Sequence, residues 1–175
     1  MYPYIRLAKA MLAPVRDPID IYEVHRDQMI CWPQDIDMFM EMNNGRIQTL
    51  YDLGRFRLSI RAGFIKLLRD NRWGLAVAGS STRYRKRITL FQRYEMRTRF
   101  LGYDERFMYL EQGMWRGETC HNHALLRTAV LGKTGTIKPR EVALAMNHPE
   151  DPPELPEWVK NWTEAEATRD WPPLL

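Results

Sequence analysis

Apolar residues between positions 44 and 72 recur at helical spacing, but they do not form a single stripe. They lie around much of the helix circumference instead. A helix on a protein surface buries only one face, so this pattern predicts a helix that the rest of the domain encloses. Gly63 is expected to divide the segment into a longer and a shorter piece, because glycine weakens a helix interior.

The period changes to two after Trp73, where apolar and polar residues alternate along extended segments. The predicted strands are 19–32, 75–88, 94–100, 106–116 and 124–131, with hairpin turns at 102–105 and 132–135. The order is therefore one strand, a long helix and about four consecutive antiparallel strands. This order predicts an α+β fold rather than alternating βαβ units.

The two ends of the chain are expected to be helical extensions of one central domain. The predicted boundaries are 1–18 for an N-terminal arm, 19–137 for the domain and 138–175 for a C-terminal extension that contains prolines. Helices are expected at 141–146 and 157–168. Trp158 and Trp162 lie four residues apart in the second helix and are expected to cover an apolar groove on this domain or on a second copy.

The N-terminal arm carries apolar residues at the spacing of a short amphipathic helix. They are Tyr4, Ile5, Ala8, Met11, Leu12 and Val15. We expect this helix to dock on its own domain, and contact with a membrane surface is the alternative. No apolar run approaches the roughly 18 residues that a membrane span requires, so stable membrane insertion is not expected.

Composition narrows the function classes. The chain has 175 residues, and its 26 basic and 22 acidic residues give a formal charge of +4. This bias suits an anionic ligand such as a polyphosphate, but it falls short of a nucleic-acid signature. Cys31 and Cys120 are isolated, without the spacing of a zinc ribbon or a disulfide framework. A reducing cytoplasm is the expected compartment.

Two short motifs have ordinary explanations. Gly132-Lys133 resembles a phosphate-binding loop, but Arg127 stands where that motif requires glycine, so a hairpin turn is predicted. His121 and His123 fall on one face of a predicted strand, but no third metal ligand accompanies them. No metal site is predicted.

A basic row is the next candidate site. Arg83, Arg85 and Arg87 alternate onto one face of the predicted strand at 75–88. Such a row suits the phosphates of a nucleotide-tailed ligand, since arginine binds phosphate in a bidentate manner. A solvated sheet face that keeps the protein soluble is the alternative.

Carboxylates and amides gather where the long helix is expected to begin. Asp35 and Asp37 lie two residues apart on predicted extended backbone and are expected to point in similar directions, shortly before Asn43 and Asn44. A helix N-terminus offers free N–H donors and a positive dipole end, which stabilise a carbonyl oxygen that gains negative charge. A carboxylate here acts either as a helix cap or as a base or nucleophile.

Together these motifs resemble a known family. The residues that carry the resemblance are Asp35, Asp37, Met42, Asn43, Asn44, Asp52 and Arg55, in the order Asp-x-Asp, Met-Asn-Asn and Asp-x-x-Arg. The order resembles the hotdog-fold thioesterases of the 4-hydroxybenzoyl-CoA thioesterase kind, and more narrowly the branch containing thioesterase superfamily member six. The closer likeness extends through 95–104 and 152–156.

The resemblance implies a fold and a reaction. The implied hotdog fold is a long helix wrapped by an antiparallel sheet, and two protomers pair as a homodimer or assemble further into a dimer of dimers. The substrate would be an acyl-CoA or acyl-carrier thioester, without a metal or redox cofactor. Asp37 would be the catalytic carboxylate. Backbone groups of Asn43, Asn44 and Gly45 would form the oxyanion contacts.

The resemblance also implies roles for other positions. Glu41, Asp52 and Arg55 would line the crevice, although Asp52 and Arg55 also suit a structural pair. Met40, Glu41 and Ile47 depart from the family pattern: Glu41 adds negative charge beside Asp37, and Met40 is expected to narrow the acyl pocket. The leading hypothesis is thus an acyl thioester hydrolase. The alternative is an acyl-thioester or lipid-binding protein without catalysis.

Overall fold

The computed structural model describes residues 3–12, 17–148, 150–170 and 172–173. Its helices are α1 (Tyr4–Leu12), α2 (Asn44–Arg61), α3 (Phe64–Asn71), α4 (Pro139–Ala145) and α5 (Glu157–Ala167), with a 3-10 turn, η1, at Pro33–Asp35. Its strands are β1 (His25–Ile30), β2 (Gly74–Tyr84), β3 (Arg93–Tyr103), β4 (Met108–Arg116), β5 (Thr119–Gly132) and β6 (Gly135–Ile137).

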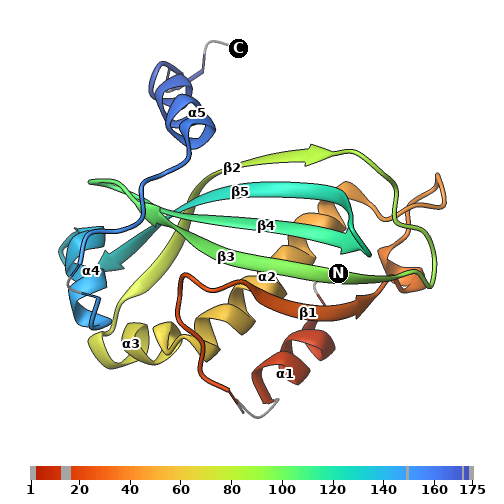
Figure 1. Ribbon diagram of the computed structural model, residues 1–175, viewed down its shortest axis with the longest axis horizontal. Coiled ribbons are helices and arrows are strands. Elements are labelled where there is room, and N and C mark those ends of the chain that lie inside the picture. The colour runs from red at the N-terminus through yellow and green to blue at the C-terminus, as the bar shows by residue number, and fades with distance from the viewer. Residues whose placement is uncertain (1–2, 13–16, 149, 171, 174–175) are drawn as a thin grey trace.

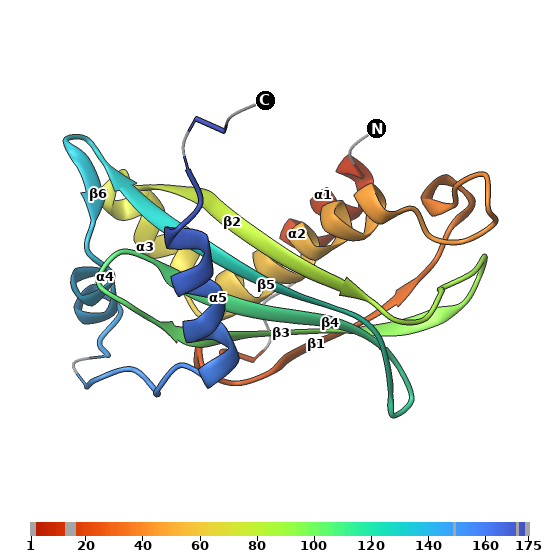
Figure 2. The ribbon, with the colours of Figure 1, turned by 90° about the horizontal axis from the view of Figure 1, so that it is seen from above.

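The strands form one antiparallel sheet in the order β1-β3-β4-β5-β2, and the short β6 pairs with β5. The sheet curls around α2, and α5 lies on the opposite face of the sheet (Figures 1 and 2). The predicted α+β arrangement of a long helix wrapped by a sheet is therefore confirmed. Strands β1 and β2 are the two edges of this arrangement.

Helix α2 lies close against the sheet at Gly54. A Cβ atom at this position would lie 2.7 Å from Thr98 Oγ1 and 2.9 Å from Gln112 Nε2. The buried Gln112 side chain donates to the Tyr51 carbonyl and to Thr98 Oγ1, and its Oε1 accepts from Arg55. A polar group can be buried at this contact because its hydrogen bonds are made.

The predicted break at Gly63 is confirmed. Helix α2 ends at Arg61 and α3 begins at Phe64, with Gly63 between them at a φ of 76°. An L side chain rarely adopts this left-handed conformation, whereas glycine does so without steric cost. The chain can therefore change direction between the two helices.

Two strands are shorter than predicted. The first strand covers only His25–Ile30 of the predicted 19–32, and β2 ends at Tyr84 rather than at Ile88. Beyond Tyr84, the N–H groups of Arg85 and Lys86 both donate to the carbonyl of His121. Alternating ladder geometry cannot continue when consecutive N–H groups share one acceptor.

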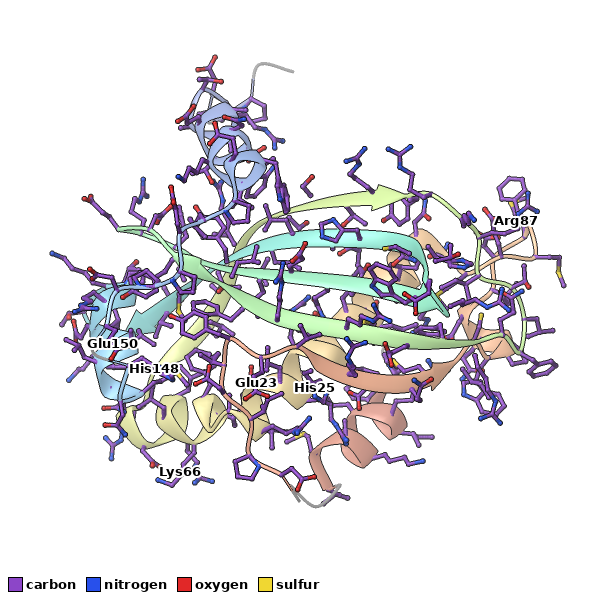
Figure 3. The ribbon with its side chains drawn as sticks, viewed as in Figure 1. Glu23, His25, Lys66, Arg87, His148 and Glu150 are labelled. Carbon is purple, nitrogen blue, oxygen red and sulfur yellow. The ribbon has the colours of Figure 1, made fainter. Side chains whose placement is uncertain are left out.

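A buried polar network joins β1 to α2 around His25 (Figure 3). Arg61 Nη1 donates to His25 Nδ1 at 2.8 Å, so His25 Nε2 carries the proton and donates to Asp27 Oδ2 at 2.9 Å. Burial alone would raise the pKa of Asp27. The hydrogen bond from His25 and the charges of Arg57 and Arg61 outweigh burial and hold that pKa below its usual value.

Helix α1 docks on α2 with an unexpected face. Arg6, Leu7 and Ala10 face the domain, whereas the predicted apolar stripe, including Ile5 and Leu12, is exposed. Docking on the protein's own domain is confirmed, but Tyr4, Ile5, Met11 and Leu12 of the apolar stripe stay exposed. Val15 lies outside the described residues. No helix in the described part of the chain is long and apolar enough to cross a membrane.

Helix α5 covers one end of the outer sheet face. Trp162 packs with Val159 and Leu125, and the guanidinium of Arg127 lies 5.3 Å from the Trp162 ring centroid. Trp158 is more exposed and contacts the ring of His123 edge-on. The groove expected beneath the two tryptophans is therefore provided by this domain.

Gly54→Ala tests the close contact of helix and sheet. The change should lower the free energy of unfolding by about 1–3 kcal/mol, because overpacking outweighs the roughly 1 kcal/mol that alanine gains over glycine in a helix. Urea denaturation measures this difference. Gly74→Ala is the matched control, since its Cβ would meet Leu131 only at 3.8 Å. Equal or higher stability of the Gly54 variant would contradict the close contact.

Candidate active site

The segment before α2 is anchored by a buried carboxylate, Asp35, which is 1% exposed. Arg6 Nη2 donates to Asp35 Oδ2 at 2.6 Å, and Arg46 Nε lies 3.3 Å from Asp35 Oδ1. The N–H of Trp32 also donates to Asp35, at 2.9 Å. These three donors fix η1 against both α1 and the first turn of α2.

Asp37 occupies a different environment from Asp35. Its Oδ1 accepts from the N–H of Phe39 at 2.9 Å, which is the hydrogen bond of an Asx turn. The Asp37 N–H donates to the Glu41 carbonyl at 2.9 Å and closes the turn. Asp35 is buried at the end of the 3-10 turn η1 and Asp37 is half-buried beyond it, so the prediction that both lie on extended backbone is wrong.

The turn that follows Asp37 carries an exposed apolar tip. Met38, Phe39 and Met40 are 87%, 72% and 62% exposed. Met40 adopts a φ of 60°, which is uncommon for a side chain of this kind. Met40 therefore projects away from the core of this chain, and the expectation that it narrows the acyl pocket stays a prediction.

The start of α2 retains two backbone donors. Asn43 caps the helix, since its Oδ1 accepts from the Arg46 N–H at 3.1 Å, and its own N–H donates to the Asp35 carbonyl at 2.9 Å. Among the described residues, no acceptor is recorded for the N–H groups of Asn44 and Gly45. Both residues are exposed, so their donors can reach a ligand oxygen.

Backbone pairing determines how the carboxylates lie relative to the helix. Asn43 pairs with Asp35, and Glu41 pairs with Asp37 at the far end of the same turn. Asp37 is therefore two residues, or roughly 7 Å of extended chain, farther from the helix start than Asp35. The first turns of α2 also contact the end of edge strand β2, where Gln48 donates to Thr82 Oγ1 at 2.5 Å.

Glu41 forms an ion pair with a basic neighbour. Its Oε2 lies 3.6 Å from Arg87 Nε, and Arg87 projects at the same end of the molecule as the 35–43 turn (Figure 3). The ion pair compensates part of the negative charge that Glu41 adds near the helix start. Glu41 therefore opposes a developing oxyanion less than its sequence position implies.

Asp52 and Arg55 form a pair on the helix rather than at its N-terminus. Arg55 Nη2 donates to Asp52, and Arg55 Nη1 donates to Gln112 Oε1 at 2.7 Å. The sequence left open whether these residues line the crevice or form a structural pair. This arrangement supports the structural pair. The pair orients Gln112, whose amide holds α2 against β3 and β4.

The predicted arginine row does not form on one strand. Arg83 lies on β2, but Arg85 and Arg87 lie in the loop that follows, because β2 ends at Tyr84. The three side chains are exposed and do not share one strand face as predicted. The interpretation of these residues as phosphate ligands stays a prediction.

A cationic hollow lies beside this loop, and the sequence analysis did not identify its lining residues as a group. It has a volume of about 500 Å³ and is lined by Lys86, Arg93, Arg116 and His121, and none of the described residues in its lining is acidic. These residues come from a loop and three strand ends, so only the fold brings them together. His121 Nδ1 lies 2.9 Å from the Arg87 carbonyl and donates to it, which leaves Nε2 as the other polar atom of the ring.

The two histidines that suggested a metal site have separate protein partners. His121 bonds to the Arg87 carbonyl, and His123 Nε2 lies 2.7 Å from Glu111 Oε1 on the outer sheet face.

Burial raises the pKa of the Cys31 thiol to about 11, helped by the nearby Asp35 charge. Cys31 is thus protonated at neutral pH and is a poor nucleophile.

Comparison with known proteins establishes the class of this chain. A sequence profile of the Thioesterase-like superfamily matches residues 31–163, and the chain belongs to this superfamily. Protein THEM6 of Drosophila melanogaster is 30% identical over 139 residues, which cover 78% of this chain and 70% of that protein. Protein THEM6 of Xenopus laevis is 30% identical over 166 residues, covering 90% and 78%.

Solved structures share the fold. A probable thioesterase of Escherichia coli, YbaW, superposes with a TM-score of 0.65 at 13% identity, covering 70% of this chain and 96% of that one. The protein SAV2348 of Staphylococcus aureus, solved in complex with CoA, superposes with a TM-score of 0.64 at 12% identity, covering 82% and 96%. The predicted hotdog fold is confirmed.

Asp35→Asn and Asp37→Asn should separate the two carboxylates. Asp35→Asn removes the charge that two arginines face and should lower the free energy of unfolding by about 3 kcal/mol. Asp37→Asn should change it by less than about 0.5 kcal/mol, because the amide oxygen still accepts from Phe39. Thermal and urea unfolding measure both values. Equal losses in the two variants would contradict the assignment of Asp35 as the anchor.

Proposed function

We propose that this protein hydrolyses acyl thioesters, with acyl-CoA as the substrate class and Asp37 as the carboxylate that carries the chemistry. The main support is the pairing of an accessible carboxylate with a helix start that keeps two exposed N–H groups. Membership of the Thioesterase-like superfamily supports the reaction type. Asp37 matches the catalytic aspartate position that the family resemblance implies.

The reaction requires two separate contributions. In one route, Asp37 attacks the thioester carbonyl to give a mixed anhydride and a thiolate, and water then hydrolyses the anhydride to the free acid and the Asp37 carboxylate. In the other route, Asp37 removes a proton from the water that attacks the thioester carbonyl. In both routes the carbonyl oxygen gains negative charge. The N–H groups of Asn44 and Gly45 would stabilise this oxygen, at about 3 kcal/mol of barrier for one well-aimed donor.

A homodimer would bring these groups together across its interface. Edge strand β2 exposes Leu75 and Val77, which are 43% and 54% exposed, and its backbone edge is free to pair in the described structure. The apolar tip at 38–40 lies near the same edge, because the first turns of α2 contact the end of β2. A second copy paired along β2 would cover both surfaces.

The basic surface beside the site suits the phosphates of CoA. Arg83 lies at the end of β2 and Arg85 lies in the loop that follows, and the cationic hollow around Lys86 and Arg116 lies next to the same loop. Bidentate arginine contacts and a concentration of positive charge favour a polyphosphate tail. The thioester group would then lie at the helix start, and the CoA tail would run from there to the basic surface.

The rival function is binding without turnover. It is favoured by one observation, that Asp37 already accepts from the Phe39 N–H and lies two residues beyond the helix-facing Asp35. A carboxylate engaged in its own turn is less available as a base. In this case the chain would retain an acyl thioester and release no thiol.

An acyl-CoA panel with thiol detection tests the proposed hydrolase. Asp37→Asn should lower kcat by at least about 100-fold, the scale of a lost acid-base group, at an unchanged melting temperature. Glu105→Gln, an exposed carboxylate in the β3–β4 turn, is the control and should retain full activity. Equal rates for wild type and Asp37→Asn would remove Asp37 from the mechanism. Saturable binding of acyl-CoA without thiol release would favour the rival.

Val77→Lys tests the proposed β2 interface. The wild-type protein should sediment as a species of twice the chain mass, and a lysine on the β2 edge should shift the population toward monomer, since a charge on an edge strand opposes pairing with a second edge. Sedimentation velocity measures the two species. Leu144→Lys, which changes an exposed apolar residue on α4, should leave the dimer intact. A dimer that tolerates Val77→Lys would exclude this edge.

A further inference from the structure

A separate hollow lies at the other edge of the sheet, between α1, β1 and α2. Its volume is about 440 Å³. Ala10 contributes from α1, Met29 from β1 and Leu53 from α2, so three elements supply an apolar part of the lining. Since β1 and β2 are opposite edges of the sheet, this hollow lies apart from the helix start and edge proposed around β2, although Arg93 also lines the cationic hollow beside the 85–87 loop.

Basic side chains accompany the apolar lining. Lys9 comes from α1, Arg57 from α2 and Arg93 from the start of β3. Arg57 Nη2 lies 3.6 Å from Asp27 Oδ1 and Arg57 Nη1 donates to the Ala10 carbonyl, so it links the three walls. Within the described part of the chain, no ion pair is recorded for Lys9 or Arg93. Positive charge is therefore in excess at the hollow.

The edge strand adds backbone hydrogen-bonding groups. Cys31 directs both its N–H and its carbonyl toward 91–92, at the β3 side. In an antiparallel ladder these directions alternate, so Ile30 and Gln28 direct their N–H and carbonyl groups toward the free edge. Both residues line the hollow. A ligand there meets apolar surface, cationic groups and backbone donors together.

We propose that this hollow binds a singly charged amphipathic anion, namely an aliphatic carboxylate of about eight to ten carbons. The volume accommodates roughly 15 non-hydrogen atoms, at about 30 Å³ each. The carboxylate would lie near Lys9, and the aliphatic chain would contact Met29 and Leu53. Asp27 in the lining disfavours a doubly charged phosphate, because like charges would face each other.

This site stands apart from the proposed hydrolysis. None of its lining residues takes part in the chemistry assigned to Asp37 or in the oxyanion contacts of Asn44 and Gly45. Binding in the hollow can therefore be present in a protein without thioesterase activity, and activity can be present without binding here. The two proposals fail independently.

Amide NMR titration with octanoate tests the site. Saturable shifts are expected at Lys9, Ala10 and Met29 in the wild-type protein. Lys9→Glu should raise Kd at least tenfold by reversing the charge, and Ala10→Phe should abolish binding by filling the hollow. Both substitutions change only side chains, so the backbone carbonyl of residue 10 can still accept the hydrogen bond from Arg57.

Matched variants separate recognition from damage. Ala8→Phe makes the same change on the outward face of α1, and Lys133→Glu reverses an exposed charge in the β5–β6 turn. Both should bind octanoate as the wild type does. The proposal is overturned if octanoate gives no saturable shifts, if Ala8→Phe weakens binding as much as Ala10→Phe, or if neutral 1-octanol binds with the same Kd.

Discussion

The ion-paired Asp35 carboxylate is the interaction on which the candidate site depends. It accepts from Arg6 of α1 and the N–H of Trp32, and it faces Arg46 in the first turn of α2. A buried charge without partners would cost several kcal/mol, so these donors must be present together. The same carboxylate fixes the segment whose next turn carries Asp37. Positioning of the helix start and of the proposed catalytic residue therefore originates from one buried anion.

The sequence predicted the parts of the fold that follow from periodicity. The enclosed helix, its break at Gly63 and the antiparallel order of strands all depend on local patterns and glycine conformation. Tertiary contacts decided the rest. Arg85 and Lys86 leave the predicted strand because both N–H groups bind the His121 carbonyl, 35 or more residues away in the chain. Helix α1 docks with a face other than the apolar stripe because Arg6 has a buried partner that periodicity cannot reveal.

The candidate site was predictable in location but not in geometry. Asn43 as helix cap and the free donors of Asn44 and Gly45 follow from the rules of helix termini. The division between Asp35 and Asp37 does not, because residues two apart share a direction only on extended backbone, and η1 ends that regularity at Asp35. The assignment of Asp37 as the catalytic carboxylate remains a prediction from the family resemblance. Asp37 lies in a turn with an exposed apolar tip, and a second subunit packed against this tip would complete the site.

The two sheet edges solve the same physical problem in different ways. An edge strand presents unpaired N–H and carbonyl groups, which need cover, charge or a partner strand. Edge β1 has α1 beside it, and the incomplete cover leaves a hollow with cationic and apolar walls. Edge β2 is covered by none of the helices in the described residues and exposes Leu75 and Val77 instead. Because cover by a helix and pairing with a strand exclude each other at one edge, β1 is suited to a small ligand and β2 to a second copy of the chain.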